Sequence, residues 1–133
     1  MVKEYLAKII AKDAQGLQLI SACCSKSIAK VGQIKYLKKN KIFLISLERF
    51  KHEKNNNTEK VNSICKFEFV DSVKSKNIYQ NNDDEIFELL GIDLFKQDKN
   101  FKITLLFKDN AFITLSTEII EVTLEDQNKQ KND

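Results

Sequence analysis

SIAKVGQIKYLKKNKIFLISLERFKHE, residues 27–53, contains two strand-like runs that meet at a polar turn. Residues 27–38 and 42–50 are rich in β-branched and aromatic side chains, and the polar residues 39–41 separate them. These runs predict an antiparallel β-hairpin. Around Gly32 the apolar residues do not fix which face is buried, so the glycine predicts a β-bulge.

The segment before this hairpin predicts a strand followed by a helix. Residues 5–11 have the composition of a strand, and Asp13 can cap a helix that ends within residues 24–26. The apolar residues of that helix recur at three- and four-residue spacing, which is typical of an amphipathic helix. Its predicted core residues are Leu17, Ile20 and Cys24.

The second half of the chain predicts a similar order of elements. Residues 61–69 predict a strand that continues or bends beyond its end, and EIFELL (85–90) predicts a short helix that Gly91 would terminate. Alternating apolar residues at 101–107 and the return at 111–124 predict a second hairpin. The expected helix caps are Asp83 and Asp84, and the expected hairpin turn is Asp109-Asn110.

Residues 51–60, KHEKNNNTEK, contain no apolar side chain and predict a solvated connection. The connection would divide a single domain, residues 1–126, into halves at about 4–50 and 61–124. Residues 127–133 are polar and are expected to form a disordered tail.

This order of elements predicts the α+β class. We expect a mainly antiparallel sheet with two short helices, arranged either as two duplicated βαββ units or as a curled, barrel-like sheet.

The composition limits the possible partners. The chain has 133 residues, of which 42% are hydrophobic, and this is enough for one core. The net charge is +3, and Arg49 is the only arginine. Because specific base and phosphate recognition relies on the planar fork of arginine, sequence-specific DNA binding is disfavoured. Weak, lysine-mediated nucleic-acid binding remains an alternative.

The apolar segments predict the compartment. No run approaches the roughly 18 apolar residues of a membrane span, and the N-terminal segment has neither the core nor the cleavage site of a signal peptide. We therefore expect a cytoplasmic protein with reduced cysteines, no membrane contact and no cofactor.

A motif between residues 31 and 53 resembles a known family. The motif consists of Val31-Gly32, Tyr36-Leu37, Leu47, Arg49, Phe50 and Glu53 and follows the helix capped by Asp13. It is similar to that of a small uncharacterised alphaproteobacterial family, a domain of unknown function, and the resemblance extends over nearly the whole chain. The family tends to have an acid where this chain has Gln33 and a tryptophan where it has His52. The resemblance implies fold and compartment and brings no assigned activity.

Arg49, His52 and Glu53 form the most suggestive polar cluster. The guanidinium of Arg49 could bind a carboxylate or phosphate ligand, or it could pair with an acid of the chain and tie the fold together. The candidate binding residues are Gly32, Tyr36, Arg49, Phe50 and Glu53.

Metal and catalytic sites are disfavoured. Cys23, Cys24, Cys65 and His52 could ligate zinc, but adjacent helical cysteines point about 100° apart, and Cys24 and Cys65 are more typical of core residues. The chain has no P-loop, no G-x-S-x-G and no paired nucleophile and base.

We therefore expect a non-enzymatic binding module for a protein partner, with sheet edges suited to strand addition. The alternatives are lysine-mediated nucleic-acid binding and a small-molecule or enzymatic site around Arg49 and Glu53.

Overall fold

The computed structural model describes residues 6–52, 58–79 and 81–127, and these contain one α-helix, one 3-10 turn and nine strands. In chain order the elements are β1 (Lys8–Ala11), α1 (Ala14–Cys24), β2 (Ile28–Leu37), η1 (Lys38–Asn40), β3 (Ile42–His52), β4 (Thr58–Phe67), β5 (Val70–Lys76), β6 (Ile86–Gln97), β7 (Asn100–Phe107), β8 (Ala111–Thr117) and β9 (Val122–Asp126).

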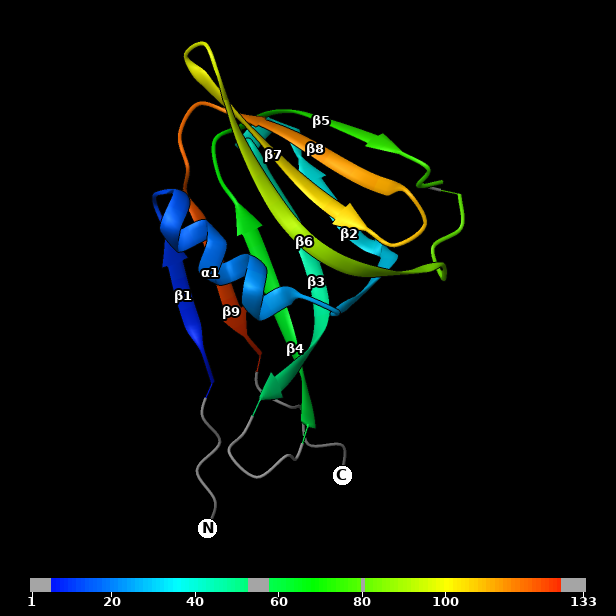
Figure 1. Ribbon diagram of the computed structural model, residues 1–133. Coiled ribbons are helices and arrows are strands. Elements are labelled where there is room, and N and C mark those ends of the chain that lie inside the picture. Colours follow the sequence, from blue (N-terminus) through cyan, green and yellow to red (C-terminus); the bar gives the residue numbers. More distant parts are fainter. Residues whose placement is uncertain (1–5, 53–57, 80, 128–133) are drawn as a thin grey trace.

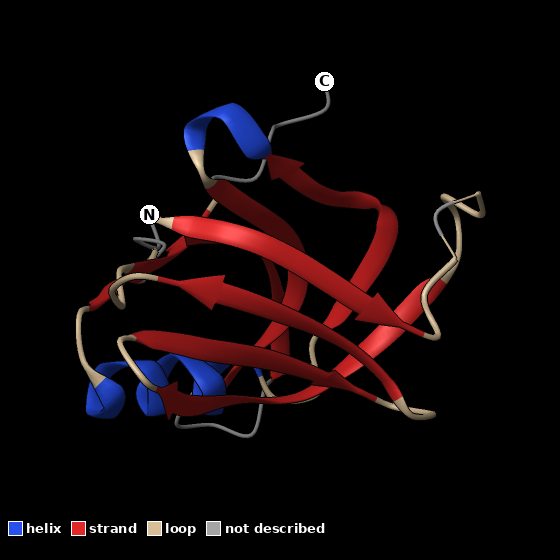
Figure 2. Ribbon diagram, turned by 90° about the horizontal axis from the view of Figure 1, so that it is seen from above, coloured by secondary structure: helices blue, strands red, loops and turns tan. Residues whose placement is uncertain are grey.

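The strands form one curled, antiparallel sheet (Figure 1, Figure 2). Its strand order is β1-β9-β4-β3-β2-β6-β7-β8-β5, and the sheet is not closed. The helix α1 packs against β6, β1 and β3 and so covers part of one face. The predicted α+β class with a mainly antiparallel sheet is confirmed.

The first hairpin and its helix agree with the sequence-based prediction. β2 pairs with β3, and the register shifts between Ala29 and Ile34, so the predicted bulge includes Gly32. The carboxylate of Asp13 accepts a 2.8 Å hydrogen bond from the amide of Gly16 and caps α1 as predicted. The buried helical residues are Leu17, Ile20 and Cys24, the three that the spacing indicated.

The predicted helix at residues 85–90 is wrong, because this segment begins strand β6. Phe87 and Leu89 are buried at a spacing of two residues, and neighbouring strands on both sides satisfy the backbone of β6. Gly91 does not terminate a helix. It lies at a register shift, next to Ile92, whose amide donates a 2.8 Å hydrogen bond to Oγ of Ser21 on α1. A short apolar run between polar residues is compatible with a helix or a strand, and pairing with β2 and β7 makes this one a strand.

The duplicated βαββ arrangement is also wrong. The second helix is missing from the described residues, and β9 pairs with both β1 and β4, which connects the two ends of the chain. The polar connection at 51–60 does not divide the molecule, since β3 and β4 extend into it and pair up to His52 and Thr58. Residues 53–57 and 128–133 lie outside the described residues.

The second hairpin is confirmed in part. β7 and β8 pair as predicted, but the predicted return strand ends at Thr117 and a separate strand, β9, begins at Val122. The buried apolar side chains form one cluster that includes residues from α1 and from the hairpins β2–β3, β6–β7 and β7–β8. Cys24 and Cys65 belong to this cluster, as the sequence predicted.

Candidate functional site

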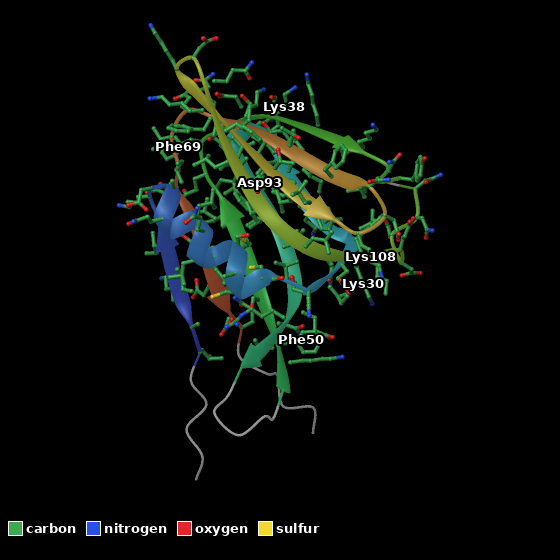
Figure 3. The ribbon with its side chains drawn as sticks, in the orientation of Figure 1. Lys30, Lys38, Phe50, Phe69, Asp93 and Lys108 are labelled. Atoms are coloured by element: carbon green, nitrogen blue, oxygen red, sulfur yellow. The ribbon has the colours of Figure 1, made fainter. Side chains whose placement is uncertain are left out.

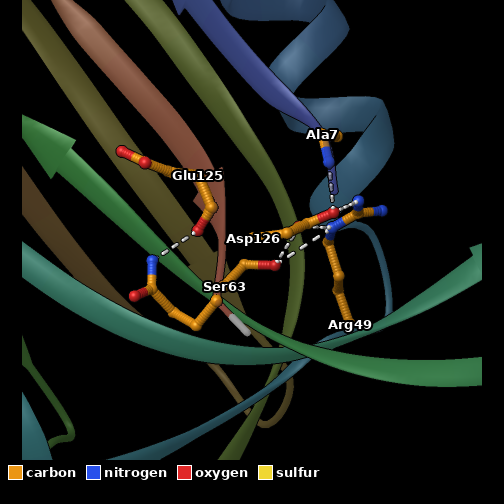
Figure 4. A network of polar contacts seen from close by, with 6 residues as sticks. Ala7, Arg49, Ser63, Glu125 and Asp126 are labelled. Carbon is orange, nitrogen blue, oxygen red and sulfur yellow. Dashed lines mark hydrogen bonds and ion pairs between the residues drawn. The ribbon is translucent and has the colours of Figure 1, made fainter. Parts of the chain in front are cut away.

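Arg49 lies inside a buried polar network near one end of the sheet (Figure 4). Its Nε and Nη2 donate to the two carboxylate oxygens of Asp126 at 2.9 and 2.7 Å. The Ser63 hydroxyl accepts from Nε at 3.1 Å and donates to Asp126 at 2.6 Å. The amide of Ala7 donates to the same carboxylate at 2.8 Å. The network therefore connects β3, β4 and β9 with the residue that precedes β1.

Burial and charge pairing act in opposite directions on Asp126. Burial alone would raise the pKa of its carboxyl, but the hydrogen bonds from Arg49, Ser63 and Ala7 outweigh burial, and the pKa is lowered. Burial alone would lower the pKa of Arg49, but the hydrogen bonds and the charge of Asp126 outweigh burial, and the pKa is raised. The side chain of Asp126 is fully buried and that of Arg49 is 9% exposed, so both charges are held inside the fold. This bidentate pair occupies the edge of the guanidinium formed by Nε and Nη2.

Of the other candidate binding residues, the structure describes Gly32, Tyr36 and Phe50, and only Gly32 and Tyr36 lie at the same place. Glu53 lies outside the described residues, and Phe50 is half-buried with Nζ of Lys60 5.6 Å from its ring centroid. Phe50 is labelled near the lower end of the molecule in Figure 3. Gly32 and Tyr36 lie together on β2, at the place where the curled sheet remains open.

This opening, which we call the seam, lies between residues 31–36 of β2 and residues 70–76 of β5. Among the described strands, β6 pairs with β2 only at residues 28–30, and β8 is the sole partner of β5. One edge of β2 and one edge of β5 are therefore without a strand neighbour in this part of the structure, and they face each other across the seam.

Specific contacts close both ends of the seam. At one end the hydroxyl of Tyr36 donates to the carbonyl of Val70 at 2.9 Å, and the amide of Val70 donates to the carbonyl of Lys41 at 2.8 Å. At the other end the amide of Gly32 donates to the carbonyl of Asp83 at 3.0 Å. A Cβ at position 32 would lie 3.0 Å from Cβ of Asp83 and 3.2 Å from its carbonyl oxygen. Glycine therefore allows residues 81–85 to approach β2 closely at this position.

A cavity of about 480 Å³ lies between these two ends. Phe43 and Ile113 form a buried floor, and the half-buried Ile34, Val73 and Ile78 form the walls. Its volume falls within the roughly 300–1,000 Å³ of typical ligand pockets. The full lining is Val31, Gly32, Ile34, Lys35, Tyr36, Phe43, Val73, Ser75, Ile78, Asp83 and Ile113.

The sequence did not indicate the partner of Arg49 or the walls of the seam. Asp126 lies on the same strand face as the buried Val122 and Leu124. An acidic residue that continues the two-residue spacing of buried apolar residues could have predicted a buried, paired carboxylate. No local pattern connects β2 with β5, because their proximity depends on how the whole sheet curls.

Two of the three cysteines, Cys24 and Cys65, are buried in the apolar core of the described structure. Burial raises the pKa of the Cys24 thiol to about 12, and burial also raises the pKa of the Cys65 thiol well above its usual value. Among the side chains that the structure describes, no three from His, Cys, Asp or Glu gather as metal ligands. The one helix described there is too short to cross a membrane.

Fold and site together define an α+β protein whose curled antiparallel sheet leaves a cavity at an open seam. A family model described as "Protein of unknown function (DUF2948)" matches residues 7–132. The chain therefore belongs to the DUF2948 family, and the predicted membership of a family of unknown function is confirmed. No curated protein and no solved structure matches the chain.

Proposed function

We propose that this chain is a non-enzymatic binding module for a protein partner and that the seam is its recognition site. The observation that carries the proposal is the pair of open strand edges on either side of a cavity with apolar walls. A partner that enters there would cover side chains that the fold leaves half-exposed.

The contrast between the two candidate sites supports this choice. Arg49 is buried and paired along one edge of its guanidinium by Asp126, whereas the cavity at Gly32 and Tyr36 is open to solvent. Gly32 and Tyr36 also form the two ends of the seam, which gives these two motif residues a shared place in the fold.

The test is a tagged pull-down from native lysate that compares two tryptophan variants. Ser75→Trp fills the cavity from β5, and Lys74→Trp adds the same side chain to the adjacent exposed position, which does not line the cavity. We expect a specific protein to be enriched by the wild type and Lys74→Trp and lost with Ser75→Trp. The proposal is wrong if Ser75→Trp retains the same protein or if none of the three enriches one.

A small-molecule ligand is a second candidate because the cavity has the volume of such a site. Native mass spectrometry of the same three proteins tests it, since a bound compound should add a constant mass that Ser75→Trp alone lacks.

Cytoplasmic location is part of the proposal. Cys23, Cys24 and Cys65 are all free thiols, which is the state that a reducing compartment maintains. Weak nucleic-acid binding through lysine would instead show a steep loss of affinity with added salt.

A further inference from the structure

We propose that the seam binds an extended peptide segment that is apolar at its centre and carries opposite charges at its two ends. This inference rests on the proposed function and specifies its ligand. Its charges would run from a basic side chain near Asp83 to an acidic side chain near Lys35.

The backbone of the seam favours an extended chain. Beyond Gly32, the side of β2 that faces away from β3 has no strand partner among the described residues, and the same holds for the side of β5 that faces away from β8. An extended peptide can add hydrogen bonds to such an edge, as in strand addition to open sheets. A compact ligand would leave those backbone groups to water.

The contacts at the two ends limit the length of the segment. Gly32 and Tyr36 mark the ends, and four strand residues span about 13 Å at roughly 3.3 Å per residue. Three extended residues therefore fit between them, and one charged residue on each side of the three lies beside Gly32 or Tyr36. A longer strand would have to displace the Tyr36 hydroxyl from Val70 or the Asp83 carbonyl from Gly32.

The walls select an apolar side chain at the centre of the segment. Strand side chains alternate between faces, so a central residue on the cavity side would contact Ile34, Val73 and Ile78. These three are only partly buried, and a branched aliphatic side chain would remove their remaining apolar surface from water.

The charges at the two ends are opposite. Asp83 and Asp84 lie beside Gly32, whereas Lys35, Lys38 and Lys39 lie at and beyond the Tyr36 end, and all five are exposed. None of them forms an ion pair with another described residue. A segment with a basic residue at the Asp83 end and an acidic residue at the Lys35 end would therefore complement the seam.

Two synthetic peptides of identical composition test the inference. Acetyl-Lys-Val-Leu-Val-Glu-amide and acetyl-Glu-Val-Leu-Val-Lys-amide differ in the order of charge along the chain and can be titrated into the labelled protein at millimolar concentration. We expect amide resonances of residues 33–37 and 70–76 to shift, with one peptide bound about fivefold more tightly than the other. The preferred peptide also reports whether the segment runs parallel or antiparallel to β2.

A charge-exchanged protein gives the decisive comparison. In the variant Lys35→Glu/Asp83→Lys both changes are at exposed side chains, and the preference between the two peptides should invert. The inference is wrong if neither peptide shifts the seam resonances, if the shifts occur elsewhere, or if the exchange leaves the preference unchanged. The peptides could fail while Ser75→Trp still abolishes the binding of a lysate protein or a small molecule. In that case only the peptide inference is wrong, and the seam remains a binding site.

Discussion

The Arg49 network and the seam treat their polar groups in opposite ways. In the network, Arg49, Ser63 and Asp126 satisfy one another with almost no exposure to solvent. At the seam, two strand edges have no strand partner among the described residues, several charges form no described ion pair, and apolar walls remain partly exposed. Both regions include residues of the same sequence motif.

This difference distinguishes motif residues that stabilise the fold from motif residues that could contact a partner. A buried charge must be paired because its desolvation is costly, so Arg49 is best explained by the fold that it holds together. An open strand edge costs little while water satisfies it, but it can exchange that water for a partner. Changes in the network should therefore alter stability, and changes in the seam should alter binding with smaller effects on stability.

The largest expected effect is that of Asp126→Ala. The substitution leaves the Arg49 guanidinium buried without its counter-charge, and breaking a buried pair in this way costs about 3–5 kcal/mol of unfolding free energy. Urea denaturation followed by circular dichroism measures it.

Two further variants make this prediction specific. Glu125→Ala, at the exposed neighbouring position, should change the unfolding free energy by less than about 0.5 kcal/mol. The double replacement Arg49→Met/Asp126→Leu removes both charges and should be far less destabilising than Asp126→Ala. Equal losses in the single and double variants would show that the network contributes something other than charge pairing.

The same pair predicts a loss of stability in acid. The pKa of Asp126 is lowered in the folded state, so its contribution is complete above the unfolded-state pKa of about 3.9 and is lost as the pH falls through the lower, folded-state pKa. Urea midpoints measured from neutral pH to strong acid should fall more steeply for the wild type than for Arg49→Met/Asp126→Leu. Parallel curves would contradict the assignment.

The sequence predicted those parts of the fold that depend on local chemistry. Asp13 indicated the start of α1, the apolar spacing identified its buried face, and Gly32 indicated a bulge, because caps, periodicity and glycine act over a few residues. The strand β6 was misread as a helix because its apolar run is compatible with both until β2 and β7 pair with it.

The candidate site was predictable only in part. The motif brought Gly32, Tyr36 and Arg49 to attention, but it could not show that the first two share a cavity while the third is paired with Asp126. The pairing joins residues 77 positions apart, and the cavity depends on the curl of the sheet. Neither the pairing nor the cavity produces a pattern among residues that are close in sequence.

Gly32→Ala should have an intermediate effect centred on the seam. The added methyl would lie 3.0 Å from Cβ of Asp83, so Asp83 must shift by a few tenths of an ångström, and such overpacking typically costs about 1–3 kcal/mol. Gly91→Ala is the matched control, because its Cβ would meet Oγ of Ser21 at an ordinary 3.5 Å. Thermal unfolding of both variants should show a clear decrease for position 32 and little change for position 91. Similar decreases would mean that the close approach of Asp83 does not explain the glycine.

Tyr36→Phe should have the smallest effect on global stability. The variant loses one hydrogen bond to the Val70 carbonyl, worth about 0.5–1.5 kcal/mol, and keeps the aromatic ring at the seam. Because this bond closes one end of the seam, the amides of β5 should exchange with solvent faster, while those of β3 and β4 change little. Hydrogen exchange with residue resolution measures the difference, and Tyr79→Phe, at an exposed position outside the cavity lining, is the control. A uniform increase in exchange across the sheet would show that Tyr36 supports the whole fold. The seam could then not be changed independently of global stability.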